Sequence, residues 1–139
     1  MQLTSFTDYS IRTLMYLAAH SQDISSVGKI SEYYGISRNH LVKVVHQLAQ
    51  FGYIETSKGR GGGIKISEGA TTLKLGDLIA RLEPNMDMVE CFDSKTNTCR
   101  ITDSCQLKHY LHEATRAYID ALNQYTLADT IMNKEILFS

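Results

Sequence analysis

The chain has 139 residues, of which 43% are hydrophobic and 21% charged, and its formal net charge is -1. This length predicts one compact domain with a short extension, and the hydrophobic fraction excludes an intrinsically disordered chain. The first ten residues lack the basic and apolar regions of a signal peptide, and no apolar stretch approaches the length of a membrane span, so we expect a cytoplasmic protein without a membrane partner.

The near-neutral total conceals two segments of opposite charge. From Ser37 to Lys65 there are five basic residues against one acid, Glu55, which gives five minus one, or +4. From Arg81 to the end there are six basic against nine acidic residues, a net of -3. A basic stretch of this kind can bind phosphate even when the whole chain is almost neutral.

Three helices are predicted in the first fifty residues. The first runs from about Thr7 to His20, with Thr7 as its N-cap and Asp8 in its first turn. The second spans Val27 to Tyr34, between Ser26 as cap and Gly35 as terminator, and the third runs from its cap Ser37 to about Phe51. Helical spacing assigns a buried face to the first helix, formed by Ile11, Leu14, Met15 and Ala18. The second and third helices have the outline of a helix-turn-helix.

Two short β-prone runs follow, Tyr53 to Thr56 and Ile64 to Ile66, joined by the basic, glycine-rich segment SKGRGGG. This pattern predicts a hairpin, and a hairpin directly after a helix-turn-helix is a wing. We therefore predict a mainly α fold, a winged helix-turn-helix with a small β-hairpin wing and a long C-terminal dimerisation helix.

The outward face of the third helix and the wing tip carry side chains suited to double-stranded DNA. Arg can pair with guanine edges, Asn and Gln with adenine edges, and Lys with phosphate. Any one of these residues could simply be solvated, but two elements in this order with the same charge favour DNA. The candidates are Ser37, Arg38, Asn39, His40, Lys43, His46, Gln47, Lys58 and Arg60.

The second half of the chain is predicted to be a short helix over Leu75 to Leu82, a loop over Asn85 to Asp103, and a long helix from about Ser104 to Tyr125. A short helix and an end of uncertain order are expected after Thr126. The long helix carries a heptad-like apolar stripe that predicts packing against a partner subunit, formed by Leu107, Leu111, Ala114, Tyr118, Leu122 and Tyr125. We expect a DNA-binding domain over 1-83, a ligand-binding loop over 84-105 and a dimerisation helix with tail over 106-139.

Cys91, Cys99 and Cys105 are the only cysteines. In a reducing cytosol such a cluster indicates metal binding, redox switching or catalysis, not a disulfide framework. The spacing lacks the CxxC pairs of common zinc sites, and no nucleophile or phosphate loop has a recognisable frame, so we expect no enzyme. Thiols spaced irregularly in a polar loop can hold an iron–sulfur cluster, although buried inert thiols are the alternative.

The chain resembles a known family in several segments: LTSFTDYSIRTLMYLA, SRNHLVKVVHQL, KGRGGGIKI, the helix from Leu75, the three cysteines and the TLAD segment. It is similar over nearly its whole length to the iron–sulfur winged-helix regulators typified by IscR and NsrR, and most to the NsrR type. The resemblance implies a homodimer that binds an inverted-repeat operator, with the recognition helix in the major groove and the wing in the minor groove.

The resemblance also implies that Cys91, Cys99 and Cys105 hold an iron–sulfur cluster, either 2Fe-2S or 4Fe-4S. In the NsrR type the fourth ligand is an aspartate at the start of the first helix of the other subunit, which corresponds to Asp8. The IscR type uses a histidine three residues after its third cysteine, where this chain has Lys108, and His109 is one residue further along. Asp8 and His109 both stay candidates at this point.

The implied function is transcriptional repression that nitric oxide relieves, acting on nitric-oxide detoxification genes. An iron–sulfur-status or redox-sensing regulator of the same family is the nearer alternative. A carrier or storage protein for iron–sulfur clusters or metal, with incidental basic charge, is the alternative from another class.

Overall fold

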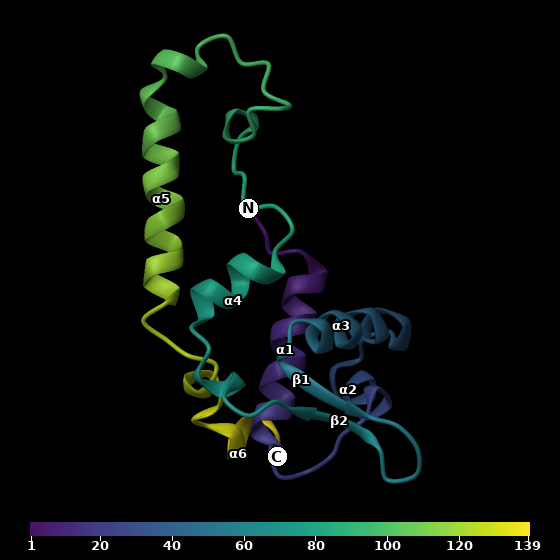
Figure 1. Cartoon of the computed structure of the whole chain (residues 1–139). Coiled ribbons are helices and arrows are strands. Elements are labelled where there is room, and N and C mark those ends of the chain that lie inside the picture. Colours follow the sequence, from purple (N-terminus) through teal and green to yellow (C-terminus); the bar gives the residue numbers. More distant parts are fainter.

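A computed structural model describes all residues from Met1 to Ser139, and the chain is mainly helical with one β-hairpin (Figure 1). No helix is both long enough and apolar enough to span a membrane. The main elements in chain order are α1 (Ser5–Ala19), α2 (Val27–Tyr34), α3 (Arg38–Gln50), β1 (Ile54–Ser57), β2 (Gly63–Ile66), α4 (Leu75–Leu82), α5 (Gln106–Leu122) and α6 (Lys134–Leu137).

The first helix begins two residues earlier than predicted, and Thr7 as its N-cap was wrong. Thr4 is the cap: its Oγ1 accepts a hydrogen bond from the backbone N–H of Thr7 at 3.3 Å. The Glu83 carboxylate holds Thr4 in place by accepting bonds from its backbone N–H at 3.1 Å and its hydroxyl at 3.3 Å. Thr7 is instead fully buried inside the helix, while Asp8 lies in the first turn as expected.

The helix-turn-helix forms at the predicted residues because its local signals are strong. Ser26 caps α2 by accepting a bond from the Lys29 N–H at 3.2 Å, and Gly35 ends that helix in the left-handed conformation, with φ of 66°. Ser37 caps α3 in the same way, accepting from the His40 N–H at 3.2 Å. The winged-helix fold is confirmed.

The wing is an antiparallel hairpin in which Ile54 pairs with Ile66 and Ser57 with Gly63. Strand β1 begins one residue later than predicted, and Ser25 adds an isolated bridge to Ile64. Hydrophobic residues of α1, α2, α3, the wing and α4 form one core, whose fully buried members include Leu14, Leu17, Ile30, Leu41, Leu48 and Leu78.

The chain after α5 returns to this core, which the sequence did not indicate. Leu127 is fully buried, and its backbone N–H donates to the carbonyl oxygen of Leu73 at 2.9 Å. Further on, Phe138 packs edge-on against Tyr16, with ring centroids 5.7 Å apart. The tail therefore joins the end of α5 to the core formed by the first four helices and the wing.

Helix α5 is shorter than predicted and projects away from the core (Figure 1). It starts at Gln106 because Thr102–Ser104 forms a separate 3-10 turn, and it ends at Leu122. None of its 17 residues is buried, and its principal contact is with α4. At that crossing the Asn123 side chain accepts from the Asp77 N–H and donates to the Asp77 carboxylate, each at 2.9 Å.

Candidate nucleic-acid interface and cysteine loop

Helix α3 presents a polar outer face above a buried apolar one. Its inner side is held to the core by Leu41, Val44, Val45 and Leu48. Most of the predicted contact residues are exposed, namely Arg38, Asn39, His40, Lys43 and His46. Gln47 is only partly exposed, and the Ser37 hydroxyl already caps the helix. The outer face can therefore offer donors and acceptors to a groove without disturbing the core.

Two side chains of this face have neighbours that fix where they lie. The His40 ring stands edge-on to Tyr9 of α1, with centroids 5.6 Å apart, which places it at the side of α3 next to α1. The Arg38 guanidinium lies beside Gly28 near the start of α2. A Cβ added to that glycine would lie 3.8 Å from Nη1 of Arg38. Arg38 thus joins the outer face of α3 to the first turn of α2.

Val42 also belongs to the outer face of α3, although it is not among the predicted contact residues. Its side chain is 52% exposed, and it is the only large hydrophobic residue of α3 that is exposed. The helical spacing would have shown this, because Val42 lies four residues after Arg38 and four before His46.

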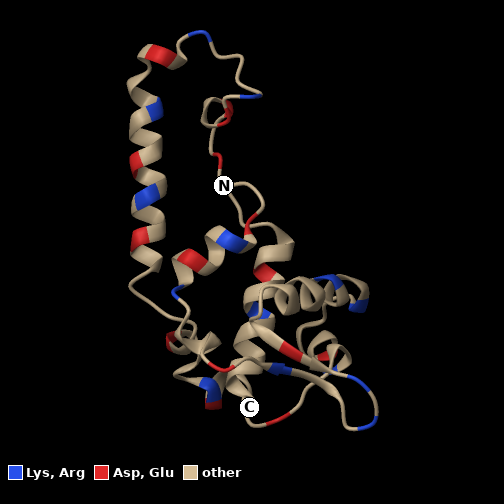
Figure 2. Cartoon of the chain, in the orientation of Figure 1, with Lys and Arg blue, Asp and Glu red and all other residues tan.

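The wing tip carries Lys58 and Arg60, both exposed, as predicted. The loop is tight, because Gly59 and Gly61 adopt φ values of 86° and 78°, and a Cβ on Gly62 would lie 2.5 Å from the carbonyl oxygen of Ser57. Basic residues mark both the outer end of α3 and the wing loop, on the same side of the molecule in Figure 2. Both elements can therefore face one polyanion.

The three cysteines lie around a long excursion of the chain between α4 and α5. Cys91 is in the 3-10 turn Glu90–Phe92, Cys99 is in the loop, and Cys105 is the residue before α5. All three are free thiols and partly buried. This part of the chain lies far from the wing (Figure 1). Phe92 stacks on His112 with centroids 3.7 Å apart, which holds the first part of the loop against α5.

Within one chain, the predicted ligands are not gathered into a site. No group of three or more His, Cys, Asp or Glu side chains is placed to hold a metal ion. The chemistry of the donors nevertheless suits an iron–sulfur cluster, since cysteine thiolates are its usual ligands. Cys91, Cys99 and Cys105 fit such a group by type.

Asp8 is in contact with Arg12 one turn further along α1. Arg12 Nε donates to one carboxylate oxygen at 3.0 Å and Nη2 to the other at 2.7 Å, with Asp8 40% and Arg12 44% exposed. The backbone carbonyl of Arg12 accepts a hydrogen bond from the Tyr34 hydroxyl at 2.9 Å. These bonds connect Asp8 through α1 to α2 of the helix-turn-helix. The other candidate, His109, is exposed in the first turn of α5.

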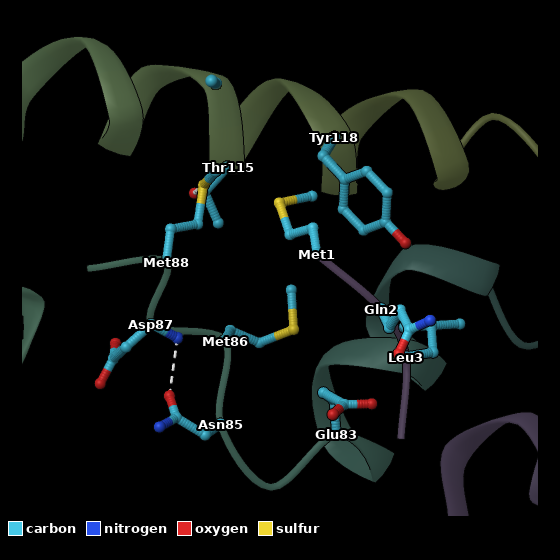
Figure 3. A pocket seen from close by; sticks show the side chains of 11 residues that line it. Met1, Gln2, Leu3, Glu83, Asn85, Met86, Asp87, Met88, Thr115 and Tyr118 are labelled. Carbon is cyan, nitrogen blue, oxygen red and sulfur yellow. Dashed lines mark hydrogen bonds between the residues drawn. The ribbon is translucent and has the colours of Figure 1, made fainter. Parts of the chain in front are cut away.

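A cavity of about 760 Å³ separates the N-terminal segment and the loop after α4 from helix α5. Figure 3 shows the side chains of Met1, Met86 and Met88 in this space, with Tyr118 on the α5 side. Thr115 donates from its hydroxyl to the Met88 sulfur at 3.1 Å. Six of the 11 residues that line the cavity are hydrophobic, and one wall belongs to α5, which has no buried residue.

The wing, the capped recognition helix and its exposed polar face define a winged helix-turn-helix transcriptional regulator. The family model of Rrf2, described as an iron-dependent transcriptional regulator, matches residues 3–133. The chain belongs to the Rrf2 family, whose members regulate transcription and are not enzymes.

Similar proteins agree with this family. The regulator NsrR of Shouchella clausii is 46% identical over 138 residues, covering 99% of this chain and 93% of its own. NsrR of Bacillus subtilis is 46% identical over 136 residues, covering 97% and 93%. Among solved structures, T. potens IscR superposes with a TM-score of 0.76 at 20% identity, covering 100% of this chain and 92% of that one. CymR of B. subtilis gives 0.74 at 20% identity, with 94% and 95% covered.

Proposed function

We propose that the chain is a homodimeric, DNA-binding repressor that senses nitric oxide through an iron–sulfur cluster and controls nitric-oxide detoxification genes in the cytoplasm. One observation carries the proposal: an exposed recognition surface and a loop with three free thiols lie in different parts of one chain. The near-full-length similarity to regulators named NsrR supports this choice of signal.

In the proposed holo-protein, Cys91, Cys99 and Cys105 hold the cluster, and Asp8 of the other subunit supplies the fourth ligand. When bound, the cluster provides iron that reacts with nitric oxide, and a 2Fe-2S or a 4Fe-4S form would serve. A carboxylate is a harder ligand than a thiolate, so it is expected to hold cluster iron more weakly. Within its own chain the Asp8 side chain is 40% exposed, so a cluster held by the other subunit can reach it. When Asp8 holds no cluster, its charge is balanced by Arg12.

The two partners of Asp8 give the proposed switch a physical form. If Asp8 held the cluster, its carboxylate would give up the two-point contact with Arg12, and that contact would be available again once Asp8 was free. The backbone carbonyl of Arg12, in the middle of α1, accepts a hydrogen bond from the Tyr34 hydroxyl at the end of α2, so α1 and the helix-turn-helix are in direct contact. The proposal is that ligation at Asp8 sets the angle between α1 and α2, and with it the position of α3.

The exposure of α5 supports the homodimer. Helix α5 has 17 residues and buries none of them, whereas helices in proteins owe most of their stability to the packing of an apolar face. Packing of the apolar stripe of α5 against the same helix of a second subunit would stabilise α5. Two-fold symmetry then places two recognition helices on an inverted-repeat operator, about 34–36 Å apart for successive major grooves.

The decisive experiment uses the full chain isolated without oxygen. We expect a visible absorption spectrum with bound iron and sulfide, which changes on adding nitric oxide. We also expect salt-dependent binding to the DNA upstream of its own gene that nitric oxide abolishes. A colourless protein without iron would contradict the cluster, and a coloured protein without sequence-specific DNA binding would contradict the repressor and favour a carrier.

The fourth ligand is tested by substitution. Asp8→Ala should alter the cluster spectrum and the nitric oxide response, whereas Asp23→Ala, an exposed acid in the loop after α1, should leave both unchanged. If Asp8→Ala behaves like the native chain and His109→Ala does not, His109 is the ligand. A spectrum that responds to oxygen or chelators but not to nitric oxide would favour the iron–sulfur-status or redox regulator.

A further inference from the structure

Val42 is an apolar side chain at a place where water-facing residues are otherwise polar. It is 52% exposed near the middle of α3, while every other large hydrophobic residue of that helix is directed into the core or partly covered. Arg38 and His46, one turn before and one turn after it, are also exposed. The three residues therefore form one row along the helix, with a branched apolar group at its centre.

In the proposed complex this row faces the floor of the major groove. A valine there can neither donate nor accept a hydrogen bond. Against the edge of adenine, guanine or cytosine, the valine would displace water from polar base atoms without offering them a hydrogen bond. The loss of those hydrogen bonds would weaken binding. Thymine alone presents an apolar group in the major groove, its 5-methyl. The chemistry of Val42 consequently matches one base.

We propose that Val42 is a specificity-determining residue that contacts the 5-methyl group of a thymine in each half-site of the operator. The inference rests on the proposed DNA-binding function and deepens it by assigning one base to one side chain. Arg38 and His46 position the row through polar contacts, and Val42 selects the base between them. The contact is apolar, so it contributes to sequence preference without adding to the salt dependence of binding.

The test needs an operator that the protein itself selects. Duplexes are enriched from a randomised library with the anaerobically isolated full chain, and the thymines of the best duplex are replaced by uracil at matching positions of both half-sites. Uracil keeps every hydrogen-bonding group of thymine and lacks only the methyl. We expect one symmetric pair of positions at which the change weakens binding about fourfold per half-site, the value of one buried methyl, or about fifteenfold in total.

Val42→Ala should abolish the difference between thymine and uracil at that pair and weaken binding to the thymine duplex by a similar factor. The substitution is expected to fold normally, because the side chain is exposed and alanine favours helix. Ile136→Ala, another exposed apolar residue outside α3, serves as control and should keep the native profile.

Two results would overturn the assignment of Val42. One is native protein that tolerates uracil at every position, and the other is a thymine preference that persists in Val42→Ala. Failure to enrich any duplex has a different meaning, because it would contradict DNA binding itself and thus the proposed function on which the inference stands.

Discussion

Two carboxylates near the start of α1 have opposite surroundings. Asp8 is 40% exposed and pairs with Arg12, whereas Glu83 is 9% exposed and accepts hydrogen bonds from Thr4. Glu83 thus ties the end of α4 to the first turn of α1, where a negative charge also complements the helix dipole. Asp8 is left available for another partner, because its contact with Arg12 is a surface ion pair of small net stability, about 0.3–0.5 kcal/mol for such helical pairs.

Tyr34 carries a residue-scale prediction. Burial, with the neighbouring Tyr33, raises the pKa of Tyr34 well above its usual value, because the neutral hydroxyl is the form that the folded chain favours. A raised folded pKa means that stability is constant below the unfolded pKa of about 10 and falls as pH rises above it. We expect Tyr34→Phe to reduce this alkaline loss, measured by urea unfolding from about pH 8 to about pH 11.

The control for Tyr34 is Tyr110→Phe, since Tyr110 is 62% exposed on α5 and the change removes the same hydroxyl group from a different place in the fold. At neutral pH, Tyr34→Phe should lower the free energy of unfolding by about 1 kcal/mol, because it removes the bond to the Arg12 carbonyl. An alkaline slope identical to that of the native chain would show that Tyr34 does not contribute to it.

At the scale of elements, the crossing of α4 and α5 depends on Gly76. A Cβ there would lie 2.5 Å from the side-chain oxygen of Asn123 and would also overlap the carbonyl oxygen of Ile119. The backbone of α5 cannot move aside without breaking the Asn123–Asp77 bonds. The absence of a side chain at Gly76 therefore lets the two helices meet closely enough to orient α5.

Gly76→Ala should consequently lower the free energy of unfolding by about 1–3 kcal/mol, the usual cost of overpacking. Gly28→Ala is the matched control: its added Cβ would meet nothing closer than 3.8 Å, and alanine favours helix. Denaturant unfolding followed by circular dichroism separates the two variants. If Gly76→Ala and Gly28→Ala were equally stable, the helix crossing would accommodate a methyl group at Gly76, and the close contacts at this residue would not limit the packing.

At the scale of the whole molecule, α5 meets the core near its C-terminal end, at α4 and the returning tail, while its N-terminal end is joined back to α4 by the cysteine loop (Figure 1). In the proposed regulator, the cysteine loop has two routes to the core within one chain, along α5 and back through the segment that follows α4, and a third route through a second subunit. A full switch between two conformations requires the ligand states to differ by about 5.5 kcal/mol in preference for them. A ligand shared between subunits would supply such a difference at the interface.

The proposed dimer is tested by charge placed on the apolar stripe of α5. Ala114→Asp changes an exposed alanine at the middle of the stripe, so the single chain should fold as before while the dimer is lost. Arg116→Ala makes the same change in net charge on the opposite face of the helix and should stay dimeric. Sedimentation should give twice the chain mass of 15.6 kDa for the native protein and the control. A dimeric Ala114→Asp would place the interface elsewhere.

By itself, the sequence determined the elements whose signals are local. Serine caps at Ser26 and Ser37, the left-handed Gly35 and the basic glycine turn of the wing depend on residues within a few positions of each other, so the helix-turn-helix and wing were predicted almost to the residue. The same holds for Cys105 at the start of α5 and Asp8 in the first turn of α1.

Only the tertiary structure decided contacts between residues far apart in the chain. Thr4 became the cap of α1 because Glu83, 79 residues away, holds it, and Leu127 entered the core through its bond to Leu73. Periodicity indicates that a helix has an apolar face but not what covers that face, so only the structure shows that the apolar face of α5 is left exposed. Local sequence fixes backbone conformation, whereas burial depends on which distant surfaces the folded chain brings together.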